Sequence, residues 1–185
     1  MKNRNWDKQA HFIMEMDPAC KSLEEARNLY PMNDALESYD IAHEYYLKGD
    51  TYAARRISQE ARRRTGIEIH PGAEIGECLM IDHGMGVVIG ETAKIGNYVM
   101  MYHGVTLGGT GKDHVHRHPT IGDHVVIGAG ATLLGPIHIG NGAKIGAGAV
   151  VLQDVPAGAT AVGVPARIIL PKSPQNENSE KISKQ

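Results

Sequence analysis

A large aliphatic residue recurs at intervals of six through the second half of the chain. The positions that keep this spacing are Ile69, Ile75, Ile81, Ile89, Ile95, Met101, Leu107, Ile121, Ile127, Leu133, Ile139, Ile145 and Val151. A period of six matches neither the face of an α-helix nor the two-residue alternation of a half-buried strand. It is typical of a parallel β-helix, in which each hexapeptide spans one flat side and one turn of a solenoid. We therefore expect three hexapeptides to make one triangular coil, with the aliphatic side chains stacked inside.

The composition supports a narrow core. The chain has 185 residues with one Phe and one Trp but 22 Gly, and 20 of these glycines lie between residues 69 and 168. Stacked aliphatic side chains fill a thin prism without space for large rings, which explains the shortage of aromatic residues. Once an irregular loop is set aside, the segment holds about five coils of roughly 18 residues each.

The composition changes near residue 67 and divides the chain into three parts. Residues 1–66, which contain Trp6, Phe12 and most of the tyrosines, are expected to form an α-helical N-terminal domain. Residues 67–171 carry the repeats and are expected to form the β-helix domain. Residues 172–185 hold almost no apolar side chains, so we expect a disordered tail.

Helix start and stop signals predict three helices in the N-terminal domain. Asp17 before a proline is typical of an N-cap followed by the first helical position, and Ser22 with Glu25 has the spacing of a capping box. A second helix is predicted up to Gly49, and a third, which ends in an arginine triplet, up to Gly66.

The charge and the cysteine content exclude several classes of protein. The net charge is −2 and the isoelectric point is near 6.5, so no overall positive field attracts nucleic acid or an anionic membrane. No apolar run approaches the roughly 20 residues of a membrane-spanning helix. Cys20 and Cys78 cannot make a disulfide framework, and no charged-then-apolar leader begins the chain. We therefore expect a cytoplasmic protein with neither nucleic acid nor a membrane as a partner.

The six-residue period is interrupted twice. The interval between Ile81 and Ile89 is eight residues, and the interval between Leu107 and Ile121 is 14. The second interruption leaves the segment GGTGKDHVHRH, residues 108–118, as an extruded loop rich in Gly and His. Regular repeats form the scaffold, so interruptions that introduce His, Asp, Arg and Lys are where we expect the functional site.

Five segments around these interruptions form a set of motifs. They are IDHGMGVVIGET (81–92), VTLGGTGK (105–112), RHPTIGD (117–123), IGAGA (127–131) and VGVPAR (162–167). Together and in this order they resemble the repeat domain of bacterial serine O-acetyltransferases, especially short-form members with a truncated helical part. The resemblance implies an α+β fold, in which an α-helical N-terminal domain precedes a left-handed parallel β-helix. It also implies transfer of acetyl from acetyl-CoA to the hydroxyl of L-serine, which gives O-acetyl-L-serine and CoA in the first step of cysteine biosynthesis.

The resemblance implies a histidine base and a carboxylate that orients it. A serine hydroxyl is a poor nucleophile near neutral pH and needs a positioned general base, a role that suits the pKa of histidine. The matching residue is His83. Glu68 matches the carboxylate that orients this base, and it precedes His83 by a little less than the length of one coil.

The resemblance also implies a clamp for a zwitterionic substrate. An ammonium group needs a carboxylate partner, and a carboxylate needs a cation. Asp82 and Asp17 match the residues that bind the substrate ammonium, although a role as helix cap alone would also explain Asp17. Arg117 and His118 match the residues that bind the substrate carboxylate.

The binding residues for acetyl-CoA are also carried over from the family. The pantetheine arm is an extended amide, and small residues let it approach the backbone closely. The resemblance points to Gly109, Ala129 and Lys144, with Lys112 and Arg167 as candidates for the phosphates. Acetyl-CoA is expected as the co-substrate, without a metal ion.

Three alternatives remain open from the sequence. The acceptor could be another small hydroxyl compound such as homoserine, because one methylene group provides only about 1–3 kcal/mol of discrimination. His114, His116 and His118 could instead gather a zinc ion, as in enzymes of the gamma carbonic anhydrase type. A trimeric scaffold without activity is the third alternative.

The resemblance also suggests partners. The family fold implies a homotrimer with active sites between neighbouring chains, or a dimer of such trimers, and feedback inhibition by L-cysteine. Relatives usually have a GxHAL-like segment where this chain reads PMNDAL (31–36), so the histidine of that segment is absent. Many relatives end in an isoleucine that binds O-acetylserine sulfhydrylase. This sequence ends in ISKQ, so that complex is not expected.

Overall fold

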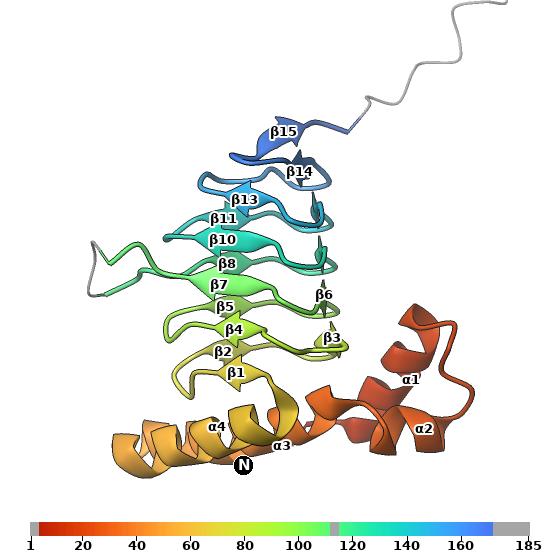
Figure 1. Ribbon diagram of the computed structural model, residues 1–185, viewed down its shortest axis with the longest axis vertical. Coiled ribbons are helices and arrows are strands. Elements are labelled where there is room, and N and C mark those ends of the chain that lie inside the picture. The colour runs from red at the N-terminus through yellow and green to blue at the C-terminus, as the bar shows by residue number, and fades with distance from the viewer. Residues whose placement is uncertain (1–3, 112–114, 172–185) are drawn as a thin grey trace, which may run out of the picture.

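The computed structural model describes residues 4–111 and 115–171. In this part of the chain four helices form a base, and a triangular prism of short strands stands on it (Figure 1). The predicted tail, residues 172–185, lies outside the described residues, and so does the chain end on which the expectation about the sulfhydrylase rests. Lys112 and His114 lie outside them as well.

The helices begin and end at recognisable caps. They are α1 (Trp6–Met16), α2 (Leu23–Asn28), α3 (Pro31–Leu47) and α4 (Thr51–Thr65). The side chain of Ser22 accepts the backbone N–H of Glu25 at 3.1 Å, as the capping box predicts. Asp50 caps α4 in the same way, and Gly66 ends that helix in the left-handed conformation at φ 73°.

The prediction that a helix begins at Asp17 is wrong. Asp17 instead follows α1 as its C-cap, and its backbone N–H donates to the carbonyl of Ile13. Its side chain accepts the backbone N–H of Ala19 at 2.8 Å, which stabilises a turn in place of a first helical turn. Helix α2 starts only after the capping residue Ser22.

Fifteen short strands build the described prism. Their bounds are β1 (Glu68–Ile69), β2 (Glu74–Ile75), β3 (Met80–Asp82), β4 (Val88–Ile89), β5 (Lys94–Ile95), β6 (Met100–Tyr102), β7 (Thr106–Gly108), β8 (Thr120–Ile121), β9 (Val126–Ile127), β10 (Thr132–Leu134), β11 (His138–Ile139), β12 (Lys144–Ile145), β13 (Val150–Val151), β14 (Thr160–Val162) and β15 (Arg167–Ile169). The first sheet contains β1, β4, β7, β10 and β13, the second β2, β5, β8 and β11, and the third β3, β6, β9, β12 and β14. All pairs in these sheets are parallel, and β15 adds to β14 in the antiparallel direction. The predicted fold, helices followed by a left-handed parallel β-helix of about five turns, is confirmed.

The six-residue period forms the core. Every aliphatic residue that keeps the period is at most 4 % exposed. The coils differ in length, however. Glu68 pairs with Val88 in the coil above it, whereas Thr132 pairs with Val150, so the lower coil is the longer one by two residues. The two extra residues of this lowest coil lie in the turn between β3 and β4, which is the first interruption of the period.

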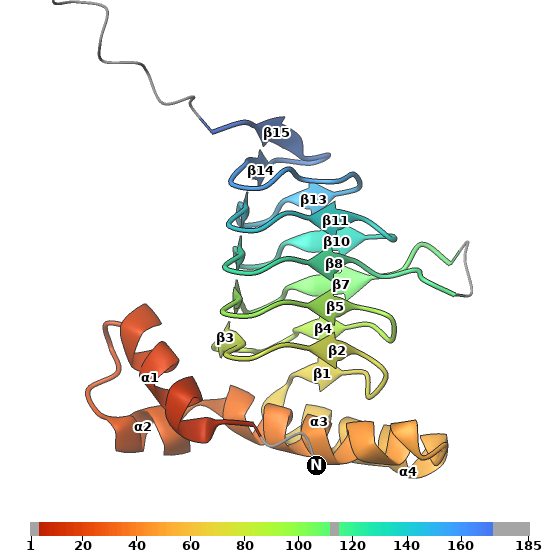
Figure 2. The same cartoon turned by 180° about the vertical axis from the view of Figure 1, so that it is seen from behind.

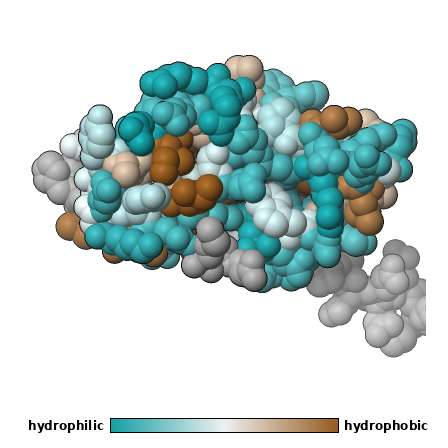
Figure 3. All heavy atoms as spheres, turned by 90° about the horizontal axis from the view of Figure 1, so that it is seen from below, coloured by the Kyte–Doolittle hydropathy of each residue, from teal (hydrophilic) through white to brown (hydrophobic). Residues whose placement is uncertain are grey.

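The helical base closes the lower end of the prism through buried polar contacts. The hydroxyl of Tyr39 in α3 donates to the carbonyl of Ala73 at 2.5 Å, and Ser58 in α4 donates to that of Ile69 at 2.6 Å. Helices α1 and α2 stand beside the lowest coils next to β3 (Figure 2). The underside of the base is mainly hydrophilic, with separate hydrophobic patches (Figure 3). None of the described helices combines the length and the apolar character that a membrane span requires.

Shortening a stacked aliphatic side chain should destabilise the whole prism. Leu133 is 0 % exposed, so Leu133→Ala should lower the free energy of unfolding by about 2–5 kcal/mol through lost burial and a residual cavity. Urea unfolding followed by circular dichroism measures this change. Leu152→Ala, at a leucine that is 55 % exposed, should change it by less than about 0.5 kcal/mol. Equal losses in the two variants would contradict the stacked-core account.

Candidate active site

His83 occupies the lengthened turn between β3 and β4, where the third sheet passes to the first. Its φ of 60° is in the left-handed region, which costs a residue with a side chain about 1–3 kcal/mol. Its imidazole is 76 % exposed and points away from the packed interior. His103 and Ala129 occupy the corresponding turns of the next two coils, so we call this corner of the prism the His83 edge. The His83 and His103 rings meet edge to face at 5.9 Å.

Two carboxylates lie beside His83. Asp82 Oδ2 is 3.8 Å from His83 Nε2. Asp17, from the turn after α1, is close enough to His83 for the two side chains to interact electrostatically. The tertiary structure therefore gathers Asp17, Asp82 and His83, although Asp17 belongs to the helical base and is distant from the other two in the sequence.

The Asp17 carboxylate is held by two hydrogen bonds. The hydroxyl of Tyr30 donates to Oδ2 at 2.5 Å, and the backbone N–H of Ala19 donates to Oδ1. Both bonds place the pKa of Asp17 below its ordinary value because they stabilise the ionised form. The bond from Tyr30 makes the larger contribution. Asp17 is therefore a fixed negative charge next to His83.

Arg117 and His118 lie on a different corner, where the first sheet passes to the second. They follow the extruded loop between β7 and β8. His118 is only 7 % exposed, and its Nδ1 accepts the backbone N–H of Thr92 at 3.1 Å. Burial lowers the pKa of His118. The ring is therefore neutral, with its proton on Nε2. We call this corner the Arg117 edge.

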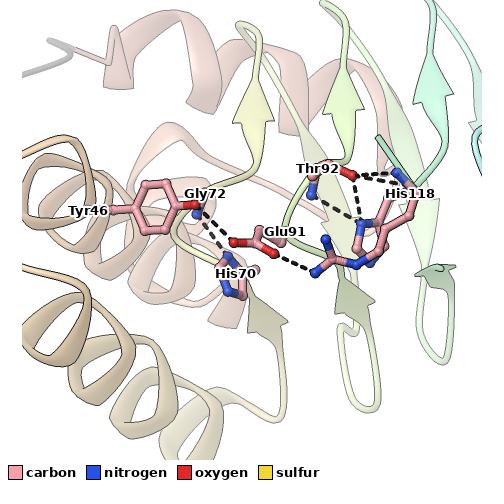
Figure 4. A network of polar contacts seen from close by, with 7 residues as sticks. Tyr46, His70, Gly72, Glu91, Thr92 and His118 are labelled. Atoms are coloured by element: carbon pink, nitrogen blue, oxygen red, sulfur yellow. Dashed lines mark hydrogen bonds and ion pairs between the residues drawn. The ribbon is translucent and has the colours of Figure 1, made fainter. Parts of the chain in front are cut away.

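A polar network supports Arg117 (Figure 4). The Arg117 guanidinium forms an ion pair with Glu91, whose other carboxylate oxygen accepts the hydroxyl of Tyr46 at 2.9 Å. The hydroxyl oxygen of Thr92 accepts the backbone N–H groups of Arg117 and His118. A cavity of about 580 Å³ opens here, and Arg117, Glu91 and Tyr46 are among its lining residues.

Sequence reasoning missed these supporting residues. Glu91 and Thr92 lie in the IGET segment, which is part of a family-like motif and directly follows the first interruption of the period. That position could have indicated that they belong to the site. Tyr46 gave no such signal, because its contact with Glu91 forms only when α3 docks against the lowest coil. His103 was also missed, although it lies one coil above His83 at the equivalent position.

Glu68 lies near His83 but has other partners. Its backbone N–H donates to the carbonyl of Val87, at the end of the turn that carries His83. Its carboxylate is 3.1 Å from Arg62 and accepts a hydrogen bond from Gln59 at 3.3 Å. The role of Glu68 as the residue that orients the base stays a prediction.

The residues predicted to bind CoA are dispersed. Ala129 lies on the His83 edge, and Lys144 is exposed on β12 in the adjoining third sheet. Gly109 lies on the Arg117 edge, where a Cβ atom would be 3.1 Å from the carbonyl oxygen of Arg117. Arg167 is exposed on β15 near the top of the prism. A single chain thus distributes these candidates over two edges.

The histidines of the extruded loop do not form a metal site in the described part. His118 is committed to Thr92, and the Nε2 atom of His116 lies 3.4 Å from the hydroxyl of Thr120. Among the described residues, no group of three His, Cys, Asp or Glu side chains converges on a common point. His114, the third histidine of the zinc alternative, lies outside the described residues.

Comparison with known proteins identifies the family. The model of the bacterial transferase hexapeptide (six repeats) matches residues 118–153. The serine acetyltransferase of Helicobacter pylori strain 26695 is 56 % identical over 157 residues, which cover 85 % of this chain and 92 % of that protein. The serine acetyltransferase of Staphylococcus aureus strain Mu50 is 55 % identical, with coverage of 85 % and 74 %.

Solved structures give the same result. The serine acetyltransferase of Neisseria gonorrhoeae in complex with serine is 43 % identical and superposes with a TM-score of 0.85, covering 89 % of this chain and 67 % of that one. Other similar structures are serine acetyltransferases in complex with cysteine and with CoA. This chain spans about two thirds of the length of these solved structures. The extent of both similarities shows that the chain belongs to the serine acetyltransferase family.

Proposed function

We propose that this serine acetyltransferase transfers acetyl directly to L-serine, with His83 as the general base. The neutral imidazole takes the proton of the serine hydroxyl while the oxygen attacks the thioester carbonyl of acetyl-CoA. The tetrahedral intermediate then collapses, the C–S bond breaks, and the proton passes to the departing thiolate. The exposed imidazole of His83, next to two carboxylates on an interrupted turn, is the observation that supports this mechanism.

The same site recognises both charges of the amino acid. Asp82 and Asp17 bind the ammonium group beside His83. Both oxygens of Asp17 already accept one hydrogen bond, but each carboxylate oxygen can accept a second. Arg117 and the Nε2–H of His118 bind the substrate carboxylate, because Arg117 keeps donors that its contact with Glu91 does not use.

A neighbouring chain completes the site. The base and the ammonium site lie on the His83 edge, whereas the carboxylate site lies on the Arg117 edge of the same chain. A homotrimer places the His83 edge of one chain against the Arg117 edge of the next, so the interface joins the two halves. In a dimer of trimers, the helical base would supply the second interface.

Acetyl-CoA binds along the His83 edge in this arrangement. Ala129 leaves room for the pantetheine arm above His83, and Lys144 supplies a cation on the adjoining sheet. Gly109 approaches from the Arg117 edge of the neighbouring chain, while Lys112 and Arg167 are candidates for the phosphates. L-Cysteine inhibits by competing with serine, because it carries the same ammonium and carboxylate groups. A cytoplasmic location belongs to this proposal, supported by the two buried free thiols of Cys20 and Cys78.

Replacing the base should abolish the reaction. The release of CoA thiol from acetyl-CoA should require L-serine, exceed the release with L-homoserine and be unaffected by a chelator. His83→Ala should lower kcat about 10²–10⁴-fold with L-serine, because no other group takes the hydroxyl proton. An unchanged kcat in the variant would overturn the role of His83, and loss of activity with the chelator would overturn the metal-free mechanism.

Mixed assemblies should show that two chains share one site. At a serine concentration well below KM, His83→Ala and Arg117→Ala each impair every site of their own homotrimer, the first because it lacks the base and the second because it binds serine weakly. When the two variants are unfolded together and refolded as a mixture, about one quarter of the sites contain His83 from one chain and Arg117 from its neighbour. Thiol release should then return to that fraction of the wild-type rate. A mixture as inactive as its components would contradict the shared site.

Removing the Tyr30 hydroxyl should alter the pH dependence of serine binding. The hydrogen bond from Tyr30 lowers the pKa of Asp17, so Tyr30→Phe raises that pKa towards its ordinary value. Asp17 then loses its charge at a higher pH when the solution is acidified, so the acidic pH at which serine affinity falls, measured as Kd by calorimetry, moves upwards. Tyr52→Phe, at an exposed tyrosine, should leave the pH profile unchanged. A profile that does not move in Tyr30→Phe would remove Asp17 from the ammonium site.

A further inference from the structure

The last turn of α3 reaches the substrate-carboxylate site through one tyrosine. The Tyr46 hydroxyl donates to Glu91 Oε1 at 2.9 Å, across 45 residues of sequence. The other oxygen of Glu91 pairs with the Arg117 guanidinium. Tyr46, Glu91 and Arg117 thus form a continuous chain of contacts from the helical base to the Arg117 edge (Figure 4).

The phenol of Tyr46 occupies a fitted slot. A Cβ atom on Gly72 would lie 2.9 Å from Cζ and 3.0 Å from the hydroxyl oxygen of Tyr46, so a larger residue would displace the ring. His70 meets the ring edge to face at 5.8 Å, and its Nδ1 accepts the backbone N–H of Gly72. The turn between β1 and β2 is therefore shaped to receive this phenol.

The Glu91 carboxylate joins the two sides of this chain. Arg117 and, less strongly, the Tyr46 hydroxyl place the pKa of Glu91 below its ordinary value. The ionised carboxylate accepts the phenolic hydroxyl with one oxygen and the guanidinium with the other. Because Tyr46 fixes the direction of the first oxygen, it also limits where the second can point.

We propose that Tyr46 is a positioning residue for the amino-acid substrate, acting through Glu91 on Arg117. Its hydroxyl sets the carboxylate plane of Glu91, which aims the remaining donors of Arg117 at the substrate carboxylate. This inference rests on the proposed role of Arg117. It makes the helical base a part of serine recognition rather than a support alone.

Other hydrogen bonds attach the helical base to the prism, so the Tyr46 hydroxyl is not needed for docking. Tyr39 and Ser58 attach the base to the prism by donating to backbone carbonyls in buried surroundings. Those bonds do not involve the Tyr46 hydroxyl, so docking persists without it. The partner of that hydroxyl is a side chain whose second oxygen holds Arg117.

The test removes the hydroxyl and leaves the ring in its slot. Tyr46→Phe should raise KM for L-serine about three- to tenfold, less than the direct loss of one hydrogen bond to a charged group because the effect reaches the substrate only through Glu91 and Arg117, with kcat and KM for acetyl-CoA unchanged. Tyr45→Phe is the matched control, since Tyr45 is adjacent and 42 % exposed, and it should change none of these constants. A fall in the melting temperature of Tyr46→Phe, or an equal rise in KM for both substrates, would overturn the inference in favour of a structural role.

A substrate in which an uncharged amide replaces the carboxylate isolates the contact with Arg117. L-Serinamide lacks the carboxylate that Arg117 binds, so kcat/KM for this compound should be the same in Tyr46→Phe and in the wild type. A loss with serinamide as large as that with serine would overturn the positioning role.

The variant Arg117→Ala distinguishes a failure of the proposed role of Arg117 from a failure of the proposed role of Tyr46. If this variant leaves KM for serine unchanged, the proposed role of Arg117 fails and the inference about Tyr46 fails with it. If Arg117→Ala raises KM for serine and Tyr46→Phe does not, the proposed function stands and only the inference about Tyr46 is overturned.

Discussion

The interior of the prism accepts one large aliphatic side chain per hexapeptide, and the rest of the structure depends on this constraint. Since the coils are parallel, each backbone pairs with the coil below, and equivalent positions stack directly above one another. Additional residues have no room inside and can only extend a corner. The candidate functional side chains therefore collect along two edges of the prism, at heights set by the coils that carry the interruptions.

The helical base extends this arrangement to substrate recognition. Tyr30, next to the start of α3, holds Asp17 on one side of the molecule, and Tyr46, near the end of the same helix, holds Glu91 on the other. Helix α3 and the residue before it thus contact carboxylates at two different edges of the prism. In the homotrimer that we propose, these two carboxylates would belong to two different active sites.

The sequence predicted the prism well because its period reports a repeated local environment, and each aliphatic position was found in the core. His83, Asp82, Arg117 and His118 were chosen as candidates because they lie in family-like motifs at interruptions of that period, and their roles stay predictions. The helix start at Asp17 was wrong because a side-chain hydrogen bond to Ala19 favours a turn, a competition that spacing alone does not resolve. Tyr46 could not be predicted because its partner is 45 residues away and is reached only when α3 docks against the lowest coil.

The strand β15 affects whether two molecules can stack end to end at high protein concentration. A parallel solenoid ends in a row of unpaired backbone groups, and another solenoid could stack on that row and continue it as a fibre. Here α3 and α4 cover the lower end, while β15 runs back along β14 against the direction of every other strand. This reversal breaks the pattern that a second prism would have to match. The chain thereby limits end-to-end polymerisation and leaves its lateral faces for assembly.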